Sequence, residues 1–173
     1  MATSVRNLDG VKTDAAVVVL NALRLDLMKL KSGSIFHADA STAIGTAAAA
    51  DLPTVIALAN AIKASYNLHI ASVCSASTGQ GAHLSVDAAN GISSADATDL
   101  ASAQTLLNEI KTDYNVHRAS AVFHHTADAT NVIASANASD LGTSITLANE
   151  LKTDINLHYA AAFASQALSI VNP

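Results

Sequence analysis

One sequence motif typical of a helix recurs along the chain, and this repetition constrains the fold more than any other feature. Three close copies share the pattern Leu-x-Asn-x-(Ile/Leu)-Lys, end on Asn-x-His, and run over 58–69, 106–117 and 147–158; a weaker copy runs over 20–30. Repetition of this length indicates one supersecondary unit copied along the chain, and such units gain stability by stacking on each other. We therefore expect a single helical-repeat domain over 1–173, with degenerate units of about 40–48 residues at approximately 10–50, 51–98, 99–139 and 140–173.

Each repeat predicts one long helix that an aspartate caps. Asp51, Asp99 and Asp140 each precede a leucine, and an aspartate there can accept bonds from the free N–H groups of the first helical turn. From these caps the apolar positions step by three and four residues, which is the pattern of helices packed at shallow angles. The sequence thus predicts an all-α array or bundle of about four long helices, each of about 20 residues or roughly 30 Å.

The connectors between these helices share a second pattern. Asp39, Asp87 and Asp128 are each followed by Thr or Asn three residues later, and by Ile44, Ile92 or Ile133 five residues later. The shared pattern predicts a common conformation with a short helical turn. Helix–helix loops usually have about 2–8 residues, whereas these connectors are long enough to travel back along a helix. Successive helices can therefore run parallel or antiparallel, and the sequence leaves the two open.

Composition argues against several functional classes. Half of the residues are hydrophobic but only 3% are aromatic, which suits close helix packing better than a ligand pocket. The net charge is −5 and no basic cluster occurs, so we expect no nucleic-acid partner. There is neither a bilayer-length apolar run nor a signal-peptide pattern, so we expect no membrane association. The sole cysteine, Cys74, permits no intramolecular disulfide.

Catalytic and cofactor motifs are absent from the sequence. No nucleophile elbow, phosphate-binding loop or dinucleotide fingerprint occurs, although each of these chemistries depends on such a local geometry. We expect a protein that is not an enzyme, with no catalytic residues and no cofactor.

Three histidines occupy one position of the apolar seam, in line with two tyrosines and an isoleucine. The seam residues that we expect to join the helices, or copies of the chain, are Tyr66, His69, Tyr114, His117, Ile155 and His158. One interpretation is a cluster of imidazoles that binds a metal or senses pH. The other is packing, in which each ring bonds a carbonyl or a connector side chain. Leu30 holds this position in the first copy, which favours packing.

Two connectors carry a histidine four residues before an aspartate. His83 precedes Asp87, and His124 precedes Asp128. On a helical turn each pair would share a face and could form one edge of a metal site. Two ligands do not make a site, so a His–Asp hydrogen bond that pins the connector to its helix is the simpler interpretation. We expect no metal, with these four residues as the candidates if one binds.

A polar stripe lies beside the apolar seam. Asn60, Asn108 and Asn149 recur in the three copies, with a lysine three residues later and a second asparagine seven residues later. A half-buried asparagine usually sets helix register or bonds a neighbouring backbone. A surface for self-association is the alternative, and the two interpretations are compatible.

The repeat resembles one found in structural proteins of tailed bacteriophages. The resemblance covers Asp51 to Tyr159, including the phrase Asn-Glu-Leu-Lys-Thr-Asp-Ile-Asn-Leu-His and the connector His124-His-Thr-Ala-Asp-Ala-Thr-Asn-Val-Ile. The first copy departs from it, with Arg24, Leu27 and Leu30 in place of Lys, Tyr and His. The resemblance implies a virion component without enzymatic activity and leaves open a place on the capsid, neck or tail.

These observations lead to three hypotheses. The first is a capsid decoration or cement protein that is made in the host cytoplasm and packs in many copies against itself and other virion proteins, such as the major capsid protein. Neck or tail components are variants of it. The second is a metal- or ligand-binding helical module that uses the His/Asp pairs. The third is a bacterial surface or filament subunit, which the missing signal peptide disfavours.

Overall fold

A computed structural model describes residues 42–73, 83, 85–124 and 127–161. This part contains three α-helices, α2 (Leu52–Ala71), α3 (Leu100–Arg118) and α4 (Leu141–Ala160), and a short 3-10 helix, η3 (Ala88–Asn90). An isolated bridge joins Val73 and His83, and no strand is formed in these residues. The all-α prediction is confirmed for the described part. The first repeat copy, Asp39 and Cys74 lie outside it, so the fourth predicted helix stays a prediction.

The three helices begin where the sequence places their caps. Asp51, Asp99 and Asp140 are the N-cap residues, and each accepts a hydrogen bond from the backbone N–H three residues later, in Thr54, Ser102 and Thr143. The hydroxyl of that third residue in turn accepts from the N–H of the aspartate, which completes a capping box. Each box satisfies orphan backbone donors of the first turn and sets the start of the helix.

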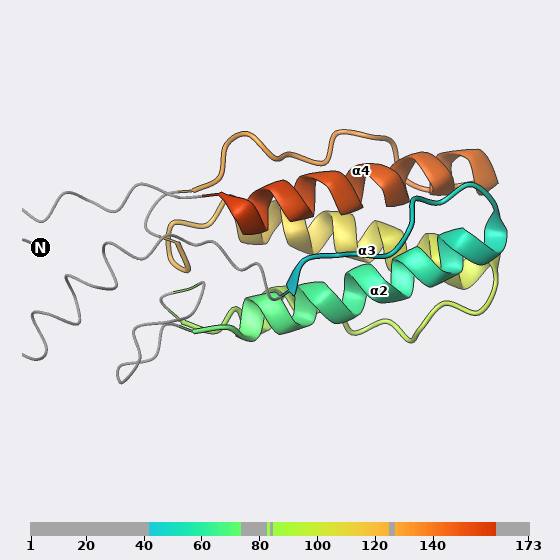
Figure 1. Cartoon of the computed structure of the whole chain (residues 1–173). Coiled ribbons are helices and arrows are strands. Elements are labelled where there is room, and N and C mark those ends of the chain that lie inside the picture. Colours follow the sequence, from blue (N-terminus) through green and yellow to red (C-terminus); the bar gives the residue numbers. More distant parts are fainter. Residues whose placement is uncertain (1–41, 74–82, 84, 125–126, 162–173) are drawn as a thin grey trace, which may run out of the picture.

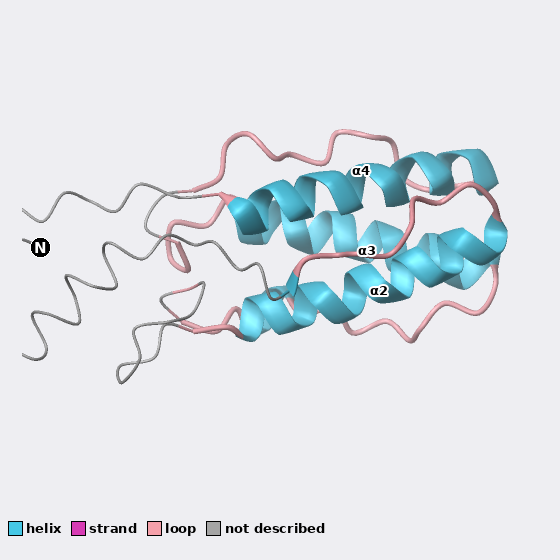
Figure 2. Ribbon diagram, in the orientation of Figure 1, coloured by secondary structure: helices cyan, strands magenta, loops and turns pink. Residues whose placement is uncertain are grey.

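The helices run parallel, because each connector returns along the helix that precedes it (Figures 1 and 2). Near the end of α2, Asn67 bonds the backbone of Ile92, and closer to its start Asn60 bonds Ala97. The connector is therefore antiparallel to α2 and delivers the chain to its starting level, where α3 begins. This arrangement explains the length of the connectors and decides the direction that the sequence left open.

The seam residues of the three helices meet in the interior. Val55, Ile62 and Tyr66 of α2 are completely buried, and so are the residues at equivalent places in the other two helices: Ala103, Ile110, Tyr114, Ser144, Leu151 and Ile155. Ile44, Ile92 and Ile133 anchor the connectors in the same core. The predicted seam thus forms the inside of one chain, where its side chains are not accessible to a second copy.

The segment before the first described helix packs on the last one, which closes the arrangement of helices and connectors. The segment before α2 returns along α4, where Asn149 bonds the backbone of Ala49 and Asn156 bonds that of Ile44. Each helix therefore carries one connector segment, and within the described residues the three helices and these segments form a closed ring. The carbonyl oxygen of Thr42 accepts a bond from Ser65 near the end of α2, and Ala161 directly follows α4, so both residues lie toward the end of the bundle where the helices finish.

Candidate functional site

Six asparagines hold the connectors onto the helices. Each makes two bonds to the backbone of a single residue, because its Oδ1 accepts the N–H and its Nδ2 donates to the C=O of that residue. For Asn108 and Ala138 these distances are 2.8 and 3.1 Å. The other pairs are Asn60–Ala97, Asn67–Ile92, Asn115–Ile133, Asn149–Ala49 and Asn156–Ile44. Bonding to a neighbouring backbone is one of the two interpretations of the polar stripe. These asparagine side chains make such bonds within one chain.

Charged side chains on the helices add to this contact. Glu109 accepts bonds from the backbone N–H groups of Ser93 and Ser94, and Glu150 accepts from those of Ala134 and Ser135. Lys63 pairs with Asp96 at 2.8 Å, a distance measured from Nζ to Oδ1. The polar stripe is therefore a docking surface for the connector in each repeat that shows these bonds.

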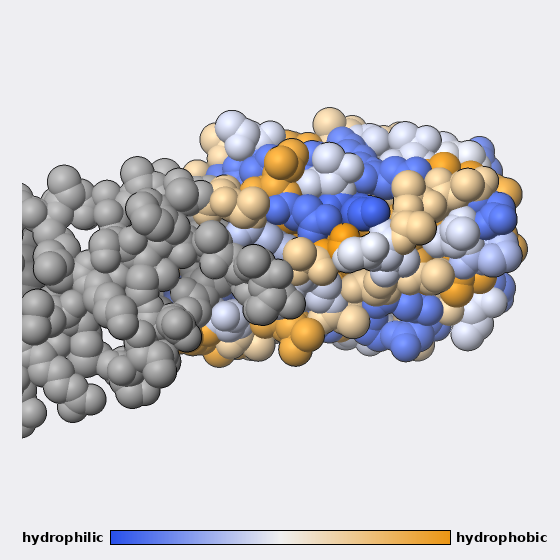
Figure 3. All heavy atoms as spheres, in the orientation of Figure 1, coloured by the Kyte–Doolittle hydropathy of each residue, from blue (hydrophilic) through white to orange (hydrophobic). Residues whose placement is uncertain are grey.

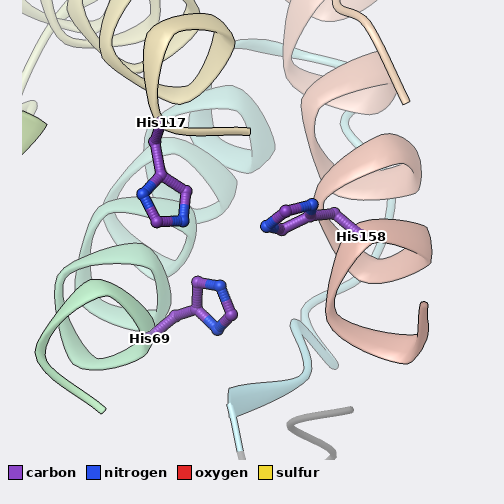
Figure 4. Close-up of side chains that lie close together, drawn as sticks. All are labelled: His69, His117 and His158. Carbon is purple, nitrogen blue, oxygen red and sulfur yellow. The ribbon is translucent and has the colours of Figure 1, made fainter. Parts of the chain in front are cut away.

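Five histidines gather at the end of the bundle where the helices finish. His69, His117 and His158 come from the three helices and point toward one another (Figure 4). His83 and His124 join them from the connectors. All five side chains are buried, with 0 to 2% exposure. Sequence reasoning aligned the three helix histidines but did not foresee that the two connector histidines would meet them.

The rings lie close enough to form a single cluster. The centroid of His69 lies 4.5 Å from that of His83, and the centroid of His117 lies 4.7 Å from that of His124. Among the helix histidines the centroid distances are 5.3 to 5.6 Å. Tyr66, Tyr114 and Tyr159 pack against these imidazoles from inside the bundle. The predicted packing role is therefore visible, but the rings pack mainly on each other.

Two aspartates orient two of the helix histidines. Nδ1 of His117 lies 2.8 Å from Oδ2 of Asp87, and Nδ1 of His158 lies 2.9 Å from Oδ2 of Asp128. Both carboxylates are buried and are also bonded by the connector asparagine three residues later. The shared Asp-x-x-Asn pattern thus builds a carboxylate that faces the end of the next helix. Asp39, the third such residue, lies outside the described residues.

The expected pairing within the connectors does not form. His83 and Asp87 do not share a helical turn, because His83 bridges to Val73 and Asp87 begins η3. His124 and Asp128 likewise lie in irregular chain. The predicted hydrogen bonds of Asp87 and Asp128 to these connector histidines are therefore wrong, and the two carboxylates bond His117 and His158 at the ends of the following helices. Instead, Nδ1 of His83 lies 3.1 Å from the carbonyl oxygen of Ser72, and Nδ1 of His124 lies 2.9 Å from that of Ser120.

Burial favours the neutral form of three histidines of the cluster. Together with the neighbouring imidazoles, it lowers the pKa of His83 to about 3 and that of His124 to about 4. Burial also lowers the pKa of His158, against the opposing effect of the Asp128 carboxylate. For Asp128, burial raises the pKa, but the bonds from His158, Asn131 and Thr130 outweigh it and hold the carboxyl ionised. At neutral pH these three imidazoles are neutral and can act as electron-pair donors.

Two groups of three histidines have the geometry to hold a metal ion. In His69, His117 and His158, one ring nitrogen of each lies within 4.8 Å of the others, and the same holds for His83, His117 and His124. Asp87 and Asp128 are two of the four residues that we considered as candidate metal ligands. Instead, each bonds the Nδ1 atom of a histidine in these groups, Asp87 that of His117 and Asp128 that of His158. Such a carboxylate fixes the tautomer and orientation of a metal-bound imidazole.

Comparison with protein-family models, with curated proteins and with solved structures finds no match for this chain. Among the described residues, no helix has the length and apolar character needed to cross a bilayer.

Proposed function

We propose that this protein is a non-enzymatic structural component of a bacteriophage virion, most simply a capsid decoration or cement protein present in many copies. The resemblance of the repeat to those of tailed-phage structural proteins suggests this role. The observation that carries it is the closed ring of three similar units, whose polar groups serve to hold connectors in place. Such a unit is a rigid block suited to packing on a symmetric surface.

The capsid is one position for such a block, and a neck or tail component is the alternative position.

A repeated apolar position offers one exposed contact point on each helix for copies or shell proteins. Leu68, Val116 and Leu157 each precede the helix histidine and are 66, 55 and 52% exposed. Elsewhere, on the face seen in Figure 3, hydrophilic and hydrophobic residues are interspersed. These three side chains are our candidates for contact with a second copy or with the major capsid protein.

Binding to particles tests the proposal. Purified protein is mixed with virions or empty shells made from the genome that encodes it, and co-sedimentation and electron cryomicroscopy follow. We expect saturable binding in symmetric positions, weakened at least tenfold by Leu68→Glu, Val116→Glu and Leu157→Glu together. The matched control is glutamate at the exposed positions one turn earlier, Ala64, Thr112 and Thr153. A chain that stays monomeric at high concentration and does not bind particles contradicts the proposal.

A further inference from the structure

We propose that His69, His117 and His158 bind one Zn²⁺ ion, or a similar imidazole-preferring transition-metal ion, that ties together the ends of α2, α3 and α4. The three side chains come from equivalent positions of three parallel helices, are completely buried, and place their ligand nitrogens within 4.8 Å of one another. The proposal does not depend on a role in a virion.

The hydrogen bonds at Nδ1 select the nitrogen that would face the metal. In His117 and His158 a carboxylate holds Nδ1, so that nitrogen carries the proton and Nε2 has the lone pair. A carboxylate–histidine–metal arrangement of this kind is the usual support of a zinc-bound imidazole. Each carboxylate pins its connector to the following helix and at the same time fixes the tautomer and orientation of the imidazole.

The charges of the site suit a divalent cation. Imidazoles that are neutral supply no charge, whereas Asp87 and Asp128 lie directly behind two of them and are 0 and 2% exposed. A buried ion with a charge of +2 needs compensation from nearby anions because the interior solvates it poorly. Two carboxylates one imidazole away from the ion provide it.

Only one of the two histidine groups can be complete at a time. Both contain His117, and this ring offers a single nitrogen once Asp87 holds the other. We favour the group formed by the helices because its members extend from three rigid elements. The ring centroid of His83 lies 4.5 Å from that of His69 and 4.8 Å from that of His117, but His83 belongs to the other group. A water molecule would therefore complete a tetrahedral site.

The fit requires only a small adjustment. Four-coordinate Zn²⁺ holds nitrogen ligands at about 2.1 Å, and therefore about 3.4 Å from one another. The ligand nitrogens lie within 4.8 Å of one another, so rotation of the rings can bring them to coordination distance. The first copy has Leu30 in place of this histidine. This does not weaken the proposal, because the three copies with histidine are those whose helices surround the proposed metal site.

Metal analysis of the full chain tests the proposal. The protein is produced without a polyhistidine tag, its metal is measured by mass spectrometry, and stripped protein is titrated with Zn²⁺ by calorimetry and melted with and without chelator. We expect one ion per chain, a lower melting temperature after stripping and recovery with Zn²⁺. Co²⁺ should give the intense visible absorption of a four-coordinate site. No bound Zn²⁺ after titration and desalting, with unchanged melting, would overturn the proposal.

Single substitutions identify the ligands. His69→Gln or His158→Gln should abolish stoichiometric Zn²⁺ binding, and Asp128→Asn should weaken it by about 10- to 100-fold. Asn60→Ala is the control, because it removes the bonds to Ala97, at the end of the connector away from the histidines, and should lower the melting temperature while one ion still binds. Retained binding in His69→Gln and His158→Gln, with loss in His83→Gln and His124→Gln, would assign the site to the other group and overturn ours.

Discussion

At the scale of single residues, the asparagine side chains that bond the connectors distinguish this fold most clearly from a simple helical bundle. Its side chain carries one acceptor and one donor, which match the C=O and N–H of an extended backbone residue. A connector lying on a helix has no strand to pair with, so its buried backbone groups would otherwise lack partners. The recurring asparagines meet this need at Ile44, Ala49, Ile92, Ala97, Ile133 and Ala138.

This role predicts a clear difference between two asparagines of one repeat. Asn108→Ala removes two hydrogen bonds to Ala138, which is 6% exposed, and leaves its backbone groups unsatisfied, so we expect a loss of about 1–3 kcal/mol in the free energy of unfolding. Asn137→Ala removes an exposed contact with Lys111 and should cost less than about 0.5 kcal/mol. Urea titrations of both variants measure the difference. Equal losses would contradict the proposed role of Asn108.

At the scale of elements, the three helices begin with the same capping box, and these boxes are sensitive to acid. In Asp51 and Asp99 the bond from the side chain of Thr54 or Ser102, and then the bond from its backbone N–H, lowers the carboxyl pKa. In Asp140 the backbone N–H of Thr143 has the larger effect in the same direction. The ionised carboxylate is therefore the form that the folded helix favours.

The sign of the pH dependence follows from these lowered pKa values. A carboxyl whose pKa is lower in the folded state stabilises the fold fully above its unfolded pKa, about 3.9, and this contribution is lost as the pH falls through the folded pKa. We expect the contribution of the capping boxes to the free energy of unfolding to be lost below about pH 4. This loss adds to the decline that begins below about pH 6.5, because the pKa values of His83, His124 and His158 are lowered in the folded state. Asp99→Asn keeps a capping acceptor without the titration, so its urea-unfolding profile between pH 5 and 2.5 should be flatter. A profile as steep as that of the unmodified protein would refute this origin.

At the scale of the whole molecule, the ring is complete within residues 42–161. Each of the three helices has a connector on its surface, and the segment before α2 closes the ring on α4. This closure joins segments about 100 residues apart in the sequence: Asn149 to Ala49 and Asn156 to Ile44. The last helix and the first connector therefore belong to one cooperative unit.

The packing of the first connector on α4 predicts which segments of the chain the bundle needs for its stability. A chain of residues 42–161 should keep the circular dichroism of the helices and unfold in one transition. A chain of residues 51–161 keeps the Asp51 cap of α2 but lacks Ile44 and Ala49, which are 5 and 6% exposed, and exposes part of α4. Its melting temperature should be lower by at least about 5 °C. Identical melting of the two chains would mean that the first connector does not close the ring.

The sequence alone determined the helices, their caps and the side chains that face the core, because these depend on periodicity and on interactions within one or two turns. It also aligned His69, His117 and His158 by their place in the repeat. Only the tertiary structure decided that the helices run parallel and that the connectors return along them. It alone brought His83 and His124 to the helix histidines and paired Asp87 with His117 and Asp128 with His158, partners 30 residues apart. Spacing along a chain reports the face of one element, whereas the meeting of two elements depends on how their surfaces pack.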